Sequence, residues 1–106
     1  MARVRLSLRA REGLRGILRY VAAQFGESVA DRVLDRIEAS LEMLATNPPT
    51  GHRREDITSD PQVRFWSVGP TLIAYRPVSA GGIEVLAIER GDRDWRNRIS
   101  DDPVSS

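Results

Sequence analysis

The sequence predicts a single α+β domain in which two helices lie on one face of a small sheet. The main observation is that the spacing of apolar residues changes from a period of two to helical spacing and then returns to two. The connections between the later segments are also short, as in an antiparallel meander. With 106 residues, of which 41% are hydrophobic, the chain can build one core but not two.

The first two elements follow from the N-terminal quarter of the chain. Residues 3–8, RVRLSL, alternate apolar side chains with Arg5 and Ser7, which predicts a short strand. From about residue 10 to residue 25 the apolar residues fall at helical spacing, which predicts an amphipathic helix. We expect Gly26 to end this helix, because glycine tolerates the left-handed conformation common at helix C-termini.

A second helix follows almost at once. Ser28 with Asp31 three residues later is typical of a capping box, and helical spacing continues to residue 45. Because the connection is so short, the two helices should form an antiparallel hairpin. Pro48 and Pro49 cannot continue a helix, so the second helix should stop near Asn47.

Three strands are predicted in the second half, at residues 63–68, 71–77 and 83–90. The breaks between them are Gly69-Pro70 and the segment 80–82, which predict two hairpins. The last strand is apolar on both sides and should be central. Residues 91–99 could add a helical turn or a short helix. We expect the single domain to span residues 1–100 and residues 101–106 to be a disordered tail.

Composition excludes several classes of site. The chain has no cysteine and one histidine, so we expect no disulfide, no metal and no cofactor. No apolar run approaches the roughly 20 residues that span a bilayer, and the N-terminus lacks a signal-peptide core. We therefore expect a cytoplasmic protein with no membrane partner. The net charge of +1 argues against direct sequence-specific DNA binding by this chain alone.

The known catalytic motifs are also missing from the sequence. There is no nucleotide-binding glycine loop, and Gly13 and Gly16 fall in mid-helix, where close packing explains them. His52 is the one candidate general base, but no carboxylate stands at a fixed spacing to orient it, so we expect it to be solvated. We assign no catalytic residue.

Arginines supply the remaining candidates. Arg11, Arg15 and Arg19 step by four along the first helix, either as a solvated face or as a surface for an acidic partner. A second group, Arg64, Arg90, Arg93 and Trp95, gathers arginine and tryptophan near the sheet. That pattern fits contact with a protein partner or with bases, or a C-terminal cap in which Trp95 closes the core. Both alternatives stay open on residues alone.

Several landmarks, taken in order, resemble the ParE branch of the RelE/ParE toxin superfamily, also described as plasmid stabilisation proteins. The resemblance covers nearly the whole chain. It rests on Ala10, Leu14, the segment Leu44-Ala45-x-Asn47-Pro48-x-x-Gly51, Arg64, the Tyr75-Arg76 pair and the turn Gly91-Asp92-Arg93-Asp94.

The resemblance implies a toxin of a type II toxin-antitoxin system. It implies a ParD-like antitoxin that covers the helical hairpin and the sheet edge, in a toxin-antitoxin hetero-oligomer, and DNA gyrase as the target inhibited by binding. In that hypothesis Arg11, Arg15 and Arg19 border a groove for acidic and apolar antitoxin groups, while Arg64, Arg90, Arg93 and Trp95 contact the target.

Two alternatives remain. The other branch of the superfamily comprises ribosome-dependent mRNA endoribonucleases, and here the sequence departs from their pattern. Leu72 stands where the RelE type has arginine, Ile99 where it has tyrosine, and Arg90 where the YoeB type has histidine. Of the groups that RNA cleavage needs, only those that stabilise the phosphorane charge are well supplied. The second alternative is a non-toxic module that binds antitoxin.

Overall fold

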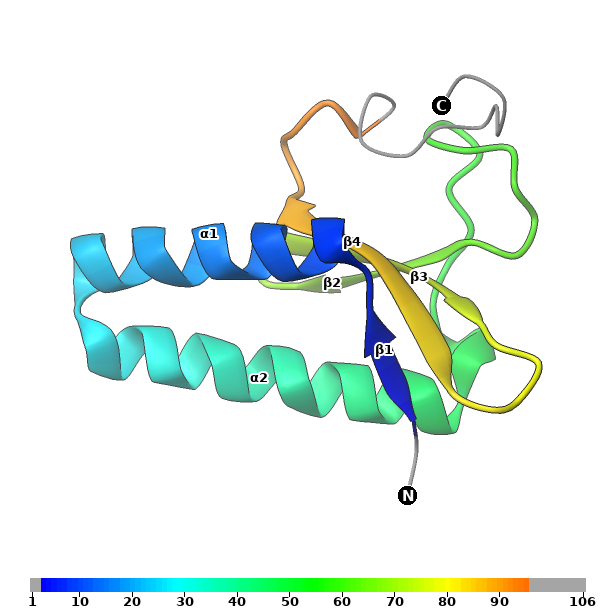
Figure 1. Cartoon of the computed structure of the whole chain (residues 1–106). Coiled ribbons are helices and arrows are strands. Elements are labelled where there is room, and N and C mark those ends of the chain that lie inside the picture. The colour runs from blue at the N-terminus through cyan, green and yellow to red at the C-terminus, as the bar shows by residue number, and fades with distance from the viewer. Residues whose placement is uncertain (1–2, 96–106) are drawn as a thin grey trace.

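The computed structural model describes residues 3–95 as one mixed sheet and a helical hairpin (Figure 1). The order of elements confirms the predicted α+β class and the predicted succession of strand, helix, helix and three strands. The elements are β1 (Val4–Leu6), α1 (Leu8–Phe25), α2 (Glu27–Thr46), the 3-10 turn η1 (Pro48–Thr50), β2 (Arg64–Val68), β3 (Thr71–Pro77) and β4 (Ile83–Arg90).

The sheet has the strand order β1-β4-β3-β2, so β4 is central, as its apolar pattern predicts. The β2–β3 and β3–β4 pairs are antiparallel, which confirms the meander. β1 pairs in parallel with β4, and this pairing cannot be read from the period of the strands. The sheet is therefore mixed. None of the helices described is long and apolar enough to cross a bilayer.

A bulge in β4 explains why that strand is apolar on both sides. The pairing with β3 shifts so that Ala74 is opposite Ala87 while Tyr75 is opposite Val85, which leaves Leu86 without a partner on β3. An extra residue reverses the alternation of side chains. Ile83 and Val85 therefore face the same core as Ile88, while Ala87 faces the opposite one.

Ser7 connects the start of α1 to this bulge. Its hydroxyl oxygen accepts a hydrogen bond from the Ala10 N–H at 3.0 Å, as an N-cap does, and its O–H donates to the Leu86 carbonyl at 2.9 Å. The helix consequently begins at Leu8, two residues before the predicted start. The serine immediately before the first helical turn was the available signal.

The turn between the helices corrects one prediction. Gly26 ends α1 as expected, with its N–H bonded to the Ala22 carbonyl and a φ of 97° that other residues rarely adopt. However, α2 begins at Glu27, and its N-terminus has no side-chain cap. The predicted capping box at Ser28 and Asp31 is therefore wrong, because Ser28 already lies inside the first helical turn.

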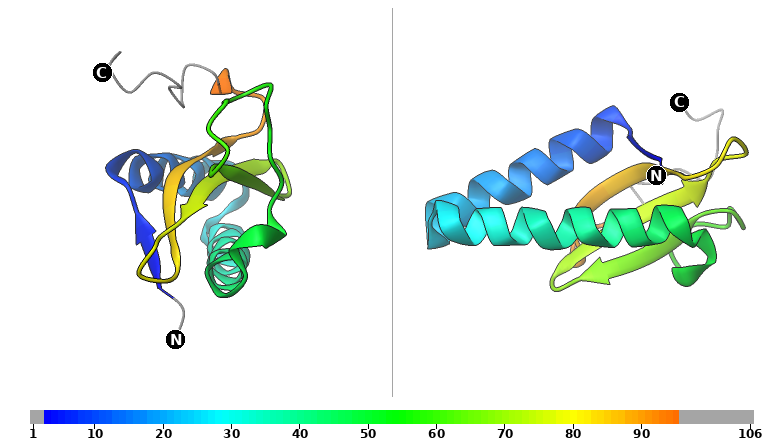
Figure 2. Two further views of the ribbon diagram at one scale, coloured as in Figure 1. Left: turned by 90° about the vertical axis from the view of Figure 1, so that its right-hand side faces the viewer. Right: turned by 90° about the horizontal axis from the view of Figure 1, so that it is seen from below.

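Apolar side chains cover both faces of the sheet. The two helices bury one core against it, centred on Ile37, Leu44, Ile73 and Tyr75. The segment 57–63 runs over the opposite face (Figure 2). There Ile57, Val63 and Trp95 form a second buried cluster with side chains of the sheet. The prediction of helices on one face is correct, but the sequence pattern did not reveal that an irregular segment would close the other.

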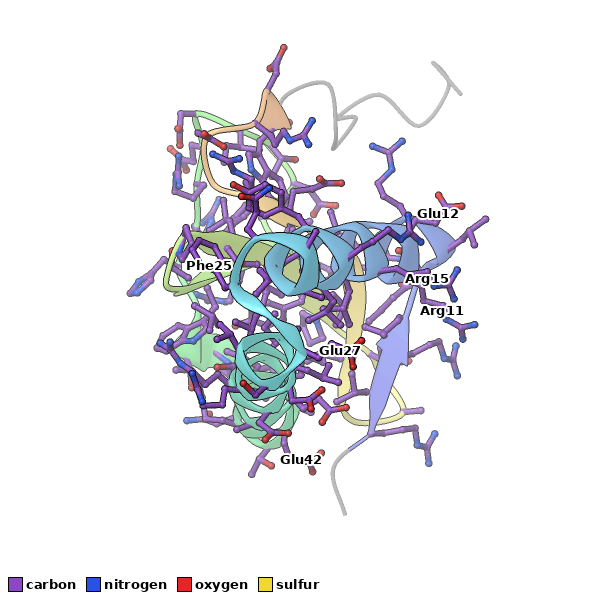
Figure 3. All side chains as sticks on the ribbon, turned by 90° about the vertical axis from the view of Figure 1, so that its left-hand side faces the viewer. Arg11, Glu12, Arg15, Phe25, Glu27 and Glu42 are labelled. Carbon is purple, nitrogen blue, oxygen red and sulfur yellow. The ribbon has the colours of Figure 1, made fainter. Side chains whose placement is uncertain are left out.

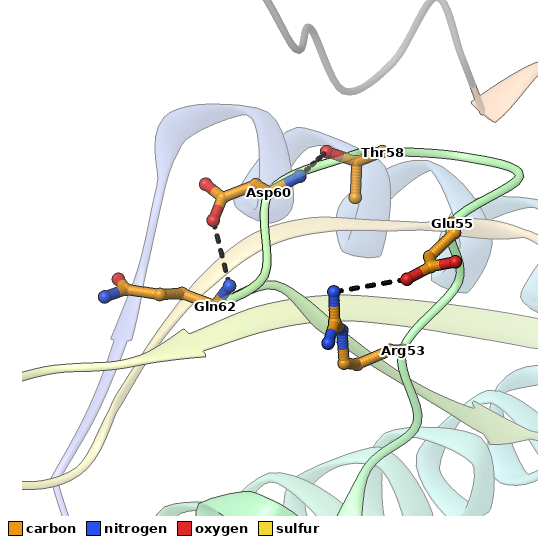
Figure 4. A network of polar contacts seen from close by, with 5 residues as sticks. All are labelled: Arg53, Glu55, Thr58, Asp60 and Gln62. Carbon is orange, nitrogen blue, oxygen red and sulfur yellow. Dashed lines mark hydrogen bonds and ion pairs between the residues drawn. The ribbon is translucent and has the colours of Figure 1, made fainter.

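This covering segment is held by short-range polar contacts. The Thr58 hydroxyl accepts from the Asp60 N–H, the Asp60 carboxylate accepts from the Gln62 N–H, and Arg53 pairs with Glu55 (Figure 4). Beneath these contacts Ile57 and Val63 are buried in the second cluster. Local turns thus satisfy the backbone while two apolar residues anchor the segment.

The Pro-Pro turn after α2 is attached to the sheet by Tyr75, which is completely buried. The Tyr75 hydroxyl accepts from the Gly51 N–H at 2.8 Å and donates to the Pro48 carbonyl at 2.5 Å. Burial raises the pKa of Tyr75, against smaller opposing effects of the Gly51 N–H and the Arg64 charge. A side chain at position 51 would overlap the Tyr75 ring, so only glycine fits there.

Replacing Tyr75 with phenylalanine should lower the free energy of unfolding by about 1–3 kcal/mol, because two buried backbone groups lose their partner. Tyr20, which is 52% exposed, provides the matched control, and its change to phenylalanine should stay within about 0.5 kcal/mol of the wild type. Urea unfolding of both variants measures the difference. Equal effects of the two substitutions would contradict the role given to the Tyr75 hydroxyl.

Candidate functional site

An open groove of about 1000 Å³ lies between the helical hairpin and the ends of the strands. One wall is a face of α1, another is Val33 and Arg36 of α2, and the third is formed where β2 ends, β3 begins and β4 ends. The groove therefore depends on how the hairpin sits against the sheet.

The α1 wall exposes large apolar side chains. Leu8 is 72% exposed, Tyr20 52% and Phe25 64%, and all three line the groove. Ile17 and Val21 lie on the same wall and are partly buried. Contiguous apolar surface of this kind, rimmed by charged residues, is typical of sites that bind another protein.

The rim of the groove carries more positive than negative charge. Four arginines line it, Arg9, Arg36, Arg90 and Arg93, against two acids, Glu12 and Glu89. Arg90 forms an exposed ion pair with Asp92 at 2.9 Å, while Arg36 and Arg93 take part in no ion pair within residues 3–95. An apolar surface with this charge balance suits a partner that offers apolar and acidic side chains.

Two glycines of α1 shape the floor of the groove in different ways. A Cβ at Gly13 would overlap the Ile88 carbonyl oxygen, so this glycine lets the helix contact the backbone of β4 directly. A Cβ at Gly16 would meet nothing within 4 Å. The close packing predicted for these glycines therefore holds for Gly13 and not for Gly16. Gly16 borders open space in the groove.

The structure separates the predicted target contacts into two pairs. Arg90 and Arg93 line the groove. Arg64 instead donates to the Gly51 carbonyl at 2.9 Å, beside the Tyr75 hydroxyl, and helps to hold the Pro-Pro turn. Trp95 is only 4% exposed, packs edge-on against Phe65 and donates its indole N–H to the Arg90 carbonyl. Trp95 therefore closes the second core, as in the cap alternative.

The three arginines of the first helix do not line the groove. Arg11, Arg15 and Arg19 are exposed on the other side of α1, and Figure 3 shows Arg11 and Arg15 pointing away from the side that carries Phe25. The groove reaches Leu8 and Glu12 next to this row, and the contact of the three arginines with an antitoxin stays a prediction. Their spacing along the helix is as predicted, but the spacing alone did not tell on which side the sheet would leave a hollow.

His52 is exposed, as expected of a residue without an orienting carboxylate. Its ring stacks on Trp66 with 6.1 Å between the centroids, and its backbone bridges Phe65 on the edge of β2. Within residues 3–95 no three histidine, aspartate or glutamate side chains gather closely enough to hold a metal ion. Arg96, Arg98 and Ile99 lie outside the described residues, as do the end of the predicted turn or helix at 91–99 and the predicted tail at 101–106.

Sequence reasoning missed the apolar wall of the groove. Phe25 was placed on the buried stripe of the first helix, and Leu8 in the first strand, because both fit an apolar period. Tyr20 lies outside that stripe, so the periodicity gives it no role. The available signal was that the apolar positions of α1 cover more of its circumference than one buried stripe needs.

A comparison with protein-family models adds the family. The model described as "ParE toxin of type II toxin-antitoxin system, parDE" matches residues 4–95. The chain belongs to the ParE toxin family. It is thus a type II toxin by family, and its partner class is an antitoxin protein. No sequence among the curated proteins matches the chain.

A solved structure has the same fold as this toxin. The matching chain comes from the structure titled "Chromosomal ParDE TA system from P. aeruginosa", with a TM-score of 0.67 and 22% identity. The match covers 85% of this chain and 96% of that one. At this identity the likeness establishes the fold, and it includes nearly all of the matching chain.

Changing each groove glycine to alanine should shift stability in opposite directions. Gly13→Ala should destabilise by more than about 1 kcal/mol, since its methyl group forces α1 away from β4. Gly16→Ala should stabilise by about 0.5–1 kcal/mol, because alanine favours a helix and nothing obstructs the methyl group. Thermal unfolding of the two variants is the measurement, and the same sign for both would contradict the packing described.

Proposed function

We propose that this toxin acts by binding DNA gyrase and that a ParD-like antitoxin neutralises it by occupying the groove. Membership of the ParE family supports the role of this chain as a toxin, and it supports an antitoxin protein as its partner. The groove supports the manner of neutralisation, because it is the large apolar concavity of the described chain and its rim is mainly basic.

The groove selects a particular kind of antitoxin segment. Leu8, Tyr20 and Phe25 can bury apolar side chains of a segment that folds on binding. Arg36 at one wall and Arg93 at another can pair with acids that flank those apolar residues. We therefore assign the antitoxin contacts to the groove arginines, in place of Arg11, Arg15 and Arg19.

Neutralisation then follows from geometry. Arg90 and Arg93 are the predicted target contacts that are exposed, and both belong to the groove rim. An antitoxin segment that fills the groove would cover them, so toxin and target could not meet while the antitoxin is bound. Trp95 supports this surface from within, since its indole N–H donates to the Arg90 carbonyl, whereas Arg64 holds the Pro-Pro turn at the other end of β2.

The described site favours binding over RNA cleavage. Leu72, which stands where the RelE type has arginine, is buried in the second core. His52 stacks on Trp66 and does not line the groove. Arginine is a poor general base because it stays protonated, so the groove arginines could stabilise a charge, and only the carboxylates of Glu12 and Glu89 on the rim could take the proton of a 2′-hydroxyl.

The free toxin should block DNA supercoiling by purified gyrase or trap cleaved DNA, and added antitoxin should relieve the effect. A double Arg90→Ala, Arg93→Ala variant should need at least about tenfold more protein for the same inhibition, given the loss of two charged contacts. Arg32→Ala removes an exposed arginine of α2 outside the groove and should change nothing.

Two other outcomes would contradict the proposal. Full gyrase activity together with ribosome-dependent mRNA cleavage would make the chain a nuclease. No effect on either target, with antitoxin binding retained, would make it a non-toxic binding module. Unfolding midpoints of the variants should equal that of the wild type, because the replaced side chains are exposed.

A further inference from the structure

The face of the helical hairpin that is turned away from the groove carries two rows of like charge. The first, the basic row, consists of Arg11, Arg15 and Arg19 on α1. The second, the acidic row, runs along α2 at steps of three or four residues and consists of Glu27, Asp31, Asp35, Glu38 and Glu42. All of these side chains are exposed.

Helical spacing places both rows on the same side of the hairpin. On α1 the basic row points away from the side that carries Phe25, as Figure 3 shows for Arg11 and Arg15, while Leu8 and Glu12 at one end of the groove stand one turn from this row. On α2 the groove side carries Val33 and Arg36, and the acidic row again lies beyond the buried stripe. One side of each helix is next to the groove, and its charged row is on another side. The two rows therefore lie side by side on one face of the hairpin.

Neither row is neutralised within the part of the chain that the structure describes. The ion pairs of the structure involve other residues, and no member of either row joins an ion pair within residues 3–95. Like charges four residues apart on a helix disfavour that helix. Two uncompensated rows side by side therefore point to a partner whose charges complement them.

The seam between the rows offers apolar contact as well. Leu18 follows Arg11 and Arg15 by seven and three residues, so it borders the basic row, and Leu34 borders the acidic row next to Asp31 and Glu38. Both leucines are only partly buried. A half-buried apolar seam flanked by charged rows resembles the pairing surface of helices that associate through apolar residues and flanking charges.

The charge pattern decides among the possible partners. A nucleic-acid backbone would be attracted to the basic row but repelled by the acidic row, and an acidic peptide would meet the same conflict. A partner must be acidic opposite one row and basic opposite the other, at the same helical spacing. This chain itself meets that requirement, because its two helices are adjacent and antiparallel.

We propose that two copies of this chain associate through this face of the hairpin. A two-fold axis parallel to the helices places the α1 of each copy against the α2 of the other, so that each basic row meets an acidic row. Such a contact is isologous, and it closes as a dimer. The part of the groove that Tyr20, Phe25 and the strand ends line faces away from this contact and stays open, while its end at Leu8 and Glu12 borders the basic row.

Charge reversal of the full-length chain tests the dimer directly by analytical ultracentrifugation. One variant carries Arg11→Glu, Arg15→Glu and Arg19→Glu, and the other carries Asp31→Arg, Asp35→Arg and Glu38→Arg. The wild type should be a dimer at low salt and dissociate at about 0.5 M salt, where screening is strong. Each variant alone should be a monomer, because the three reversed charges give its two rows the same net sign, and an equimolar mixture should regain the mass of the dimer.

Several outcomes would overturn the proposal. If the wild type is a monomer at low salt, the proposal is wrong. This measurement needs no variant, so it stays decisive even if a variant fails to fold. A dimer in either reversed variant, or monomers in the mixture, would also contradict the pairing. Duplex DNA binding by a monomeric wild type, lost in the variant with the reversed basic row, would assign that row to nucleic acid instead.

Discussion

The direct contact of α1 with the backbone of β4 at Gly13 is the constraint on which the other features depend. Because no side chain separates helix and strand there, the Ile88 carbonyl lies against the helix, and Ser7 at the helix start reaches the Leu86 carbonyl of the β4 bulge. This fixes the tilt of the hairpin on the sheet. The free side of α1 and the ends of the strands then form the groove, with Arg90 and Arg93 at its rim.

A second constraint holds the far end of the hairpin. Tyr75 uses its hydroxyl to join Pro48 and Gly51 to the middle of the sheet, and Arg64 adds a bond to the Gly51 carbonyl. The turn after α2, predicted only as the end of that helix, is thus a buried attachment point to the sheet. The attachment explains why a glycine follows the two prolines, because a side chain at position 51 would overlap Tyr75. Burial of Tyr75 at this point also raises the pKa of its hydroxyl.

Much of the fold could be predicted because apolar periodicity reports on which side of an element is buried. The strands at 64–68, 71–77 and 83–90, the stop at Pro48 and the turn at Gly26 all follow from local chemistry. The parallel pairing of β1, the covering of the second sheet face by Ile57 and Trp95, and the groove depend on contacts distant in sequence. Arg90 and Arg93 are close in sequence, so their proximity could be predicted. The side of α1 that borders the groove depends on contacts distant in sequence, so it could not.

The proposed antitoxin site is the groove walled by α1. Hydroxyl-radical footprinting of the free and antitoxin-bound toxin measures it side chain by side chain. Tyr20 and Phe25, exposed on the groove wall, should lose most of their reactivity on binding, whereas His52 and Met43, exposed elsewhere, should keep theirs. Unchanged labelling of Tyr20 and Phe25 in a saturated complex would contradict the claim.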